Sequence, residues 1–171
     1  DFSDIKTLRK YIQDGRVTIQ ILEGRLGEVT VEGNRYFSAH RILWYWPLES
    51  GQVLRSRAIR WGLSRLNAHP DRAVQALLKP GATTGQTDIV LKVTDERPLH
   101  AGFQWDRQGT KPIGRFRYGP YVRHNNLLGL DDILIGGMTF GRHFAAAYAQ
   151  YLLPLTPYGT TASFGFSHSQ V

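Results

Sequence analysis

The stretch HNNLLGLDD, residues 124–132, lies between two segments whose side chains alternate like those of β-strands. It contains asparagines, aspartates and a glycine, residue types that are typical of turns. Asn125 and Asn126 can adopt a left-handed backbone or cap the turn with their side chains. The apolar pair Leu127 and Leu128 has three open explanations: insertion into a membrane interface, packing on neighbouring strands, or a small cluster in an ordinary surface loop.

Strand-like segments follow one another in quick succession after Pro98, and the turn joins the second to the third. They are HAGFQWDR (residues 100–107), IGRFRYGPYVR (113–123), DILIGGMTF (132–140), HFAAAYAQYLL (143–153) and TTASFGFSHS (160–169). Because only short links separate these segments, we predict an antiparallel meander.

The last segment shows the alternation most clearly, with Phe164 and Phe166 opposite Ser163 and Ser167. A soluble sheet with one apolar face has this pattern, and so does a membrane barrel with lipid outside and a polar lumen. Strands of about 8–11 residues suit a tilted crossing of the bilayer. Because so few strands would leave open edges, which hydrocarbon does not tolerate, we expect the sequence to be the front portion of a longer protein.

The chain before Pro98 mixes helix-like and strand-like segments, and we place a boundary at residues 96–98. GRVTIQILEG (15–24), GEVTVEGN (27–34), RAVQALLKPG (72–81) and TDIVLKVTDE (87–96) have the alternation of strands. AHRILWYW (39–46), with Ser38 as N-cap, and VLRSRAIRWGLSRLNAHP (53–70) are predicted helices. Residues 26–96 are thus expected to follow the order β-α-α-β-β, with both helices on one face of a three-stranded sheet.

Composition excludes several classes of function but leaves the partner open. A formal net charge of +7 fits nucleic acid, anionic lipid headgroups or a solvated basic surface. The chain has no cysteine and no apolar run of about 18 residues, so disulfides and a transmembrane helix are not expected. The histidines lack ligand spacing, and no nucleophile elbow or phosphate loop is present. We therefore expect no metal, no cofactor and no enzymatic activity.

Four motifs, in the same order along the chain, resemble two-partner secretion transporters of the ShlB/FhaC type, in the Omp85 superfamily. They are ILEGRLGEVTVEGNRYFS (21–38), LSRLNAHPDRAVQALLKPGATTGQTDIVLKVTDERP (63–98), NNLLGLDD (125–132) and YLLPLTPYGTTASFGFSHSQV (151–171). The first two resemble the second POTRA domain of these transporters, and the last two resemble early barrel strands. Asp131 stands where the family's turn has a glycine.

The resemblance implies an α+β POTRA domain followed by an all-β antiparallel meander that forms the start of an outer-membrane β-barrel. Residues 1–25 would be the final strand of a preceding POTRA domain or a linker, residues 26–97 the POTRA domain, and residues 98–171 the first barrel strands. It also implies export of a secreted TpsA-like exoprotein across the Gram-negative outer membrane, with the POTRA domain in the periplasm and outer-membrane lipids around the barrel.

Three groups of residues are candidates for function. A POTRA helix and edge strand would bind the exoprotein as an added strand, through Arg57, Trp61, Arg65, Arg72, Val74 and Ala76. The barrel lumen would be lined by Arg115, Arg117 and Arg123. The turn motif comprises Asn125, Asn126, Leu127, Leu128, Gly129 and Asp131. A solvated helix face and a covered strand edge are the alternatives for the first group.

Two other functions are open alternatives. A single POTRA domain before a barrel also resembles autotransporters with a fused patatin-like lipase, in which the exported passenger belongs to the same chain. A soluble basic module is the alternative from another class, because arginines interleaved with Phe116 and Tyr118 resemble a platform for single-stranded nucleic acid. No nucleic acid is expected if the transporter interpretation holds.

Overall fold

The computed structural model describes residues 6–13, 16–111 and 114–171, with side chains from Glu23 onward. The chain divides into two compact units, residues 1–95 and residues 96–171. The described part contains no helix that is both long and apolar enough to span a membrane.

The first unit begins with a β-hairpin. Strand β1 (Lys6–Gln13) pairs antiparallel with β2 (Arg16–Glu23), from Lys6 opposite Glu23 to Gln13 opposite Arg16. The predicted strand GRVTIQILEG is confirmed as β2, but the expectation of a single strand in this region was wrong. Strand β1 was missed because KTLRKYIQ interrupts its apolar residues with charged ones and does not alternate.

A three-stranded sheet follows, with the order β3-β5-β4. Strand β3 (Arg25–Glu32) is parallel to β5 (Gln86–Asp95), and β4 (Arg72–Pro80) is antiparallel to β5. The predicted β-α-α-β-β order is confirmed. Strand β4 is paired on one side only, so it is an edge strand.

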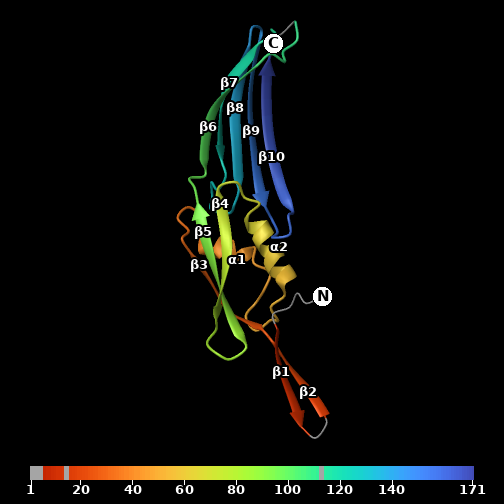
Figure 1. Cartoon of the computed structure of the whole chain (residues 1–171). Coiled ribbons are helices and arrows are strands. Elements are labelled where there is room, and N and C mark those ends of the chain that lie inside the picture. Colours follow the sequence, from red (N-terminus) through yellow and green to blue (C-terminus); the bar gives the residue numbers. More distant parts are fainter. Residues whose placement is uncertain (1–5, 14–15, 112–113) are drawn as a thin grey trace. The chain divides into compact units, whose positions relative to one another are not determined.

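Both helices lie on one face of this sheet (Figure 1). Helix α1 (Ala39–Trp44) begins after Ser38, whose Oγ accepts a hydrogen bond from the Arg41 N–H at 3.2 Å, so the predicted N-cap is confirmed. Helix α2 (Ser56–Leu66) begins later than predicted, because Val53 forms a β-bridge with Arg25. At Gly62 a Cβ atom would lie 2.7 Å from Pro47 Cδ, so glycine allows α2 to approach this segment closely.

The core lies between this sheet face and the helices. Val74 is buried while its neighbours Ala73 and Gln75 are exposed, which is the alternation of a strand with one covered face. The buried apolar residues are Leu26, Phe37, Ile42, Tyr45, Trp46, Leu54, Leu66, Val74, Ile89, Leu91 and Val93.

The second unit is a single antiparallel sheet in which the strands lie in chain order (Figure 1). Its strands are β6 (Leu99–Asp106), β7 (Arg117–His124), β8 (Ile133–Gly141), β9 (Phe144–Pro154) and β10 (Thr161–Gln170). The predicted meander is confirmed. The predicted start of one strand, Ile113, lies outside the described residues. Strand β7 begins at Arg117, because Gly114 has a φ of +97°, which an extended strand does not allow.

Candidate functional site

The register of the second unit separates its side chains into two faces, because cross-strand partners share a face and neighbours along a strand do not. What we call the apolar face carries Phe103, Trp105, Tyr118, Val122, Leu134, Met138, Phe140, Ala147, Ala149, Tyr151, Phe164 and Phe166, together with His124, His168 and Gln170 near the strand ends. What we call the polar face carries Gln104, Asp106, Arg117, Tyr121, Arg123, Ile135, Thr139, Phe144, Tyr148, Gln150, Leu152, Ser163, Ser167 and Ser169.

The two faces differ most sharply in charge. The strands β6–β10 contain three Asp, Glu, Lys or Arg residues, namely Asp106, Arg117 and Arg123, and all three lie on the polar face. The apolar face is not packed into a protein core: Phe164 is 66% exposed and Phe166 is 69% exposed. A sheet in water would bury such a face, whereas a sheet in a bilayer turns it toward lipid.

Aromatic side chains form a cluster near one end of the apolar face. The rings of Trp105 and Phe116 stack with their centroids 5.8 Å apart, and those of Phe103 and Tyr118 stack at 6.3 Å. Tyr118 also contacts Phe140 on the next strand. Rows of aromatic residues near strand ends are typical of the interfacial girdles of outer-membrane barrels.

Two of the predicted lumen arginines lie on the polar face and have partners there. Arg117 makes two bonds to Asp106 across the strand pair, Nε to Oδ1 at 3.1 Å and Nη2 to Oδ2 at 3.2 Å. Arg123 Nε donates to Asn125 Oδ1 at 2.6 Å. Gln104 donates to Thr139 at 3.2 Å on the same face. The polar face is therefore joined across strands by hydrogen bonds.

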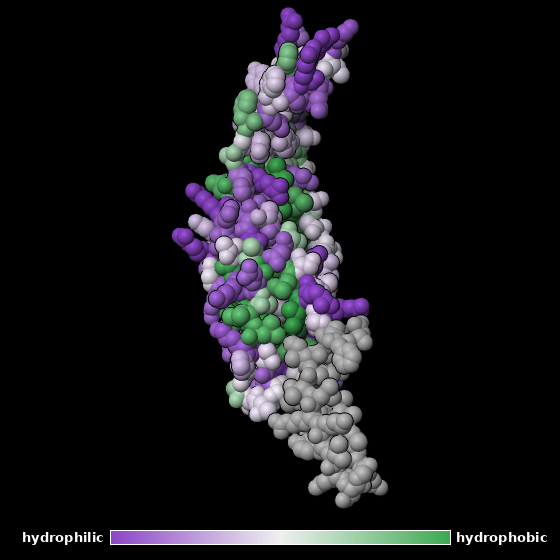
Figure 2. All heavy atoms as spheres, viewed as in Figure 1, coloured by the Kyte–Doolittle hydropathy of each residue, from purple (hydrophilic) through white to green (hydrophobic). Residues whose placement is uncertain are grey.

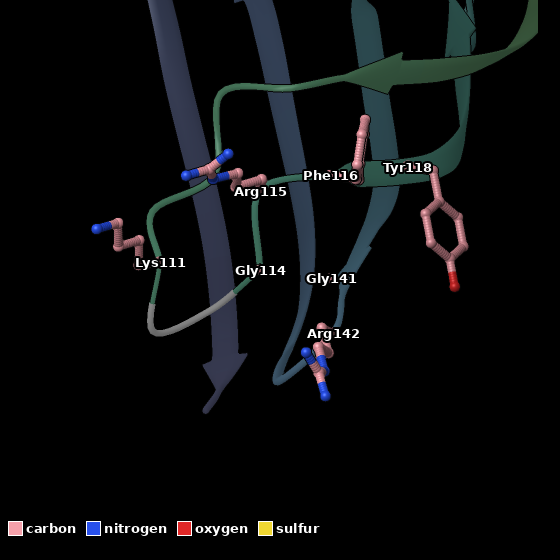
Figure 3. A pocket seen from close by; sticks show the side chains of 7 residues that line it. All are labelled: Lys111, Gly114, Arg115, Phe116, Tyr118, Gly141 and Arg142. Atoms are coloured by element: carbon pink, nitrogen blue, oxygen red, sulfur yellow. The ribbon is translucent and has the colours of Figure 1, made fainter.

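Arg115, the third predicted lumen residue, precedes β7 and lies in the connection between β6 and β7. It lines a shallow hollow with Lys111 and Arg142, and Figure 3 shows these cationic side chains projecting in different directions. They do not converge on one point, so the hollow is not a formed anion site. No cluster of His, Asp or Glu in the described residues has a geometry that could hold a metal ion.

Tyrosines lie over glycines on the polar face, an arrangement that was not predicted from the sequence. A Cβ atom at Gly102 would lie 2.6 Å from the hydroxyl of its cross-strand partner Tyr121, and one at Gly137 would lie 2.7 Å from the hydroxyl of its partner Tyr148. Both tyrosines thus lie flat against the sheet. Glycine paired with an aromatic residue is a recurrent way of stabilising strand pairs.

The edge of β4 is divided into an occupied part and an open part. Asn67 Nδ2 donates to Val74 O at 3.0 Å, and Val74 N donates to Asn67 Oδ1 at 2.7 Å. Both main-chain groups of Val74 therefore point away from β5. Because main-chain direction alternates along an antiparallel strand, the N–H and C=O groups of Ala76 and Leu78 point outward too. These two residues present the open part of the edge.

The predicted binding residues of this unit differ in accessibility. Arg57 is exposed, while Trp61 and Arg65 are half-buried on α2. Arg72 is buried: its Nε donates to Leu66 O at 3.0 Å, at the end of α2, and its guanidinium lies over the ring of Phe37.

Arg72 therefore stabilises the carboxyl end of a helix, and the side chain of Val74 belongs to the core. Arg72 and Val74 could therefore contact a partner only through their main-chain groups, and the main-chain groups of Val74 are already hydrogen-bonded to Asn67. Asn67 was not among the predicted binding residues, although it lies within the LN-x-x-P pattern of the quoted motif. Leu77 and Leu78, which are exposed, were not predicted either. Figure 2 shows hydrophobic surface over β4 and β5.

The turn between β7 and β8, residues 125–132, is held by its own polar side chains. Asp132 is fully buried, and its carboxylate accepts hydrogen bonds from the N–H groups of Leu128 at 2.9 Å and Leu130 at 3.2 Å. The hydroxyl of Tyr151, on β9, donates to the same carboxylate at 3.0 Å. Asn126 Oδ1 accepts from Asp131 N at 3.0 Å.

Two residues of this turn have left-handed backbone. Gly129 has a φ of +79° and Asp131 has a φ of +56°. Asp131 is the single described residue other than glycine with a positive φ. Glycine adopts this conformation without strain. This explains why the corresponding turn of the two-partner secretion transporters has a glycine where this chain has Asp131.

The fold and the two faces define a class: a POTRA domain followed by the opening strands of an outer-membrane β-barrel. The model of the family described as haemolysin secretion/activation protein ShlB/FhaC/HecB matches residues 85–170. The chain belongs to this family. Membership places it in the outer membrane of a Gram-negative bacterium, with the POTRA domain in the periplasm.

Individual relatives agree with this family. The outer membrane transporter CdiB of Dickeya dadantii is 25% identical over 162 residues, which are 93% of this chain and 28% of that protein. The heme/hemopexin transporter protein HuxB of Haemophilus influenzae (strain 86-028NP) is 26% identical over 126 residues, 72% of this chain and 22% of that protein. The chain thus spans less than a third of the relatives it matches.

Solved structures agree as well. CdiB from Escherichia coli superposes with a TM-score of 0.76 at 26% identity, covering 98% of this chain and 32% of that chain. BamA from Haemophilus ducreyi, in a form lacking POTRA domains 1–3, superposes with a TM-score of 0.69 at 17% identity, covering 98% and 33%. The second likeness shows the fold alone.

Proposed function

We propose that the chain is part of a two-partner secretion transporter that exports a separate secreted protein across the outer membrane. Residues 26–97 act as its periplasmic POTRA domain and residues 98–171 as its first barrel strands, while residues 1–25 are the end of a preceding POTRA domain or a linker. Family membership supports this function.

The observation that carries the proposal is the confinement of charge to one face of the meander. Asp106, Arg117 and Arg123 lie on the polar face, opposite an exposed face rich in aromatic and alanine side chains. In the proposed transporter the apolar face contacts lipid, and the polar face lines the path of the exported chain. Transport involves no enzymatic chemistry and no nucleic acid. The free energy for export comes from folding of the exported protein outside the cell.

The partner docks first on the POTRA domain, as an added strand at the open part of β4. The outward N–H and C=O groups of Ala76 and Leu78 provide main-chain hydrogen bonds, which depend little on the partner's sequence. The exposed side chains of Leu77 and Leu78 add apolar contact. Arg57, Trp61 and Arg65 on α2 contact the partner's side chains. Asn67 limits the register, because an added strand that extends to Val74 must displace it.

Replacement of Ala76 by proline is expected to weaken partner binding about tenfold or more. Proline removes one outward N–H donor and interrupts the added ladder, while an edge position whose N–H faces away from the sheet tolerates proline. The measurement is the affinity of the full-length transporter, in detergent, for the purified amino-terminal region of its secreted partner. Ala76→Ser is the matched control, because it keeps the N–H group.

Thermal unfolding of each variant shows whether the sheet is intact. An Ala76→Pro protein that unfolds normally and binds the partner as tightly as Ala76→Ser would show that β4 is not the docking edge. A variant with normal unfolding and weakened binding supports the proposal.

A further inference from the structure

The turn at residues 125–132 reverses the usual distribution of polar and apolar side chains. Leu127 is 44% exposed, Leu128 is 66% exposed and Leu130 is 42% exposed. The polar residues Asn125 and Asp132 are 2% and 0% exposed. A turn in water normally presents its polar side chains to solvent, so this turn is built for a less polar surrounding.

The turn is fastened to the apolar face of the sheet. Tyr151 lies on that face, as the partner of Leu134 in the β8–β9 register. Its hydroxyl donates to Asp132, and the same carboxylate holds the main-chain N–H groups of Leu128 and Leu130. The leucine-bearing part of the turn is thereby tied to the side of the sheet that faces lipid in the proposed function.

The turn lies at the end of the sheet where β6 begins, directly after the residues proposed as the POTRA domain in the chain. Asn125 N donates to Pro98 O at 2.8 Å, directly before β6. The connection between β9 and β10 lies at this end too, with Leu155 and Tyr158 exposed. Because the POTRA domain is periplasmic, this end lies at the periplasmic leaflet, where leucine and tyrosine side chains suit the interface.

Several main-chain donors of the turn have partners within the protein. Leu128 N and Leu130 N are bound by Asp132, Asp131 N is bound by Asn126, and Asn126 N donates to His124 Nδ1 at 3.2 Å. A segment that leaves water loses free energy for each donor it leaves unpaired. For these donors the internal bonds remove that obstacle to insertion.

We propose that this turn is a preformed membrane anchor, which inserts Leu127, Leu128 and Leu130 into the phospholipids of the periplasmic leaflet. The anchor rests on the proposed function, since it requires the apolar face to contact lipid. It sets the depth of the first barrel strands in the bilayer at the point where the POTRA domain is attached.

Site-directed spin labelling tests the anchor directly. Residues 1–171 contain no cysteine, so Leu128→Cys can be labelled alone once any cysteine elsewhere in the full-length protein is replaced. The protein is reconstituted in vesicles of phosphatidylethanolamine and phosphatidylglycerol. Collision of the nitroxide with oxygen, which partitions into lipid, is compared with collision with a water-soluble nickel chelate. The reference positions are Phe166→Cys on the apolar face and Gln75→Cys on an exposed part of β4.

The proposal predicts that the label at residue 128 collides at least threefold more with oxygen, relative to nickel, than the label at residue 75. A label at residue 128 that behaves like the one at residue 75, or that neither reagent reaches, overturns the anchor while residue 166 remains lipid-exposed. A nickel-accessible label at residue 166 overturns the proposed function itself. Leu128 is exposed and outside the core, so its replacement leaves the fold intact.

Discussion

Phe166→Arg is expected to lower the fraction of the full-length protein that assembles as a folded barrel. Phe166 lies midway along β10, on the apolar face, opposite Ala149. An arginine on the lipid face near the bilayer midplane costs about 2–4 kcal/mol, which lowers the folded-to-unfolded ratio by about 30- to 1,000-fold. This loss is a large part of the stability of an ordinary domain, about 5–15 kcal/mol.

The matched control is Ser167→Arg, one residue further along the same strand. Ser167 lies on the polar face opposite Tyr148, so its arginine would enter an aqueous lumen. The measurement is the fraction of each variant that migrates as the compact, unheated species on a denaturing gel after membrane extraction. Equal tolerance of both arginines would contradict the assignment of the two faces.

Asp132→Ala is expected to destabilise the folded protein by on the order of 3 kcal/mol or more. The carboxylate accepts from Leu128 N, Leu130 N and the Tyr151 hydroxyl, and its removal leaves these donors without their partner. Each buried donor left unsatisfied costs about 1–3 kcal/mol. The measurement is the free energy of unfolding in vesicles, from a urea titration.

Two gentler variants separate the contributions in this network. Tyr151→Phe removes a single hydrogen bond, worth about 1 kcal/mol, and Asp132→Asn keeps one acceptor oxygen. The expected order of destabilisation is Asp132→Ala first, then Asp132→Asn, then Tyr151→Phe. If Asp132→Ala were no more harmful than Tyr151→Phe, the carboxylate would not be what holds the turn.

Sequence alternation predicted the strands of the second unit well, because the two faces of the sheet differ in polarity. Phe164 and Phe166 alternate with Ser163 and Ser167 along β10, and this pattern survives in the register. The start of β7 was placed too early because the alternation of GRFRYG continues back through Arg115. The left-handed backbone of Gly114 ends the extended conformation there. Periodicity reports which medium a side chain faces and not where the backbone turns.

The edge of β4 shows a second limit of predicting structure from sequence alternation. Alternation in RAVQALLKP predicts which side chains share a face, and Arg72, Val74 and Ala76 do share one. It does not show that this face points toward the helices, since arginine is rarely buried. Arg72 is buried because the Leu66 carbonyl and the ring of Phe37 lie beside its guanidinium. The pairing of Asn67 with Val74 joins residues seven positions apart through a side chain, which no periodicity reveals.

The central claim is that the apolar face contacts lipid and the polar face contacts water, and cysteine scanning along β10 tests it most directly. Single cysteines at residues 163–167 of the full-length transporter, in intact outer membranes, are exposed to a water-soluble maleimide. Our account predicts labelling with a period of two, with residues 163, 165 and 167 labelled and residues 164 and 166 protected until detergent is added. Uniform labelling, or protection of residues 163, 165 and 167 alone, would contradict it.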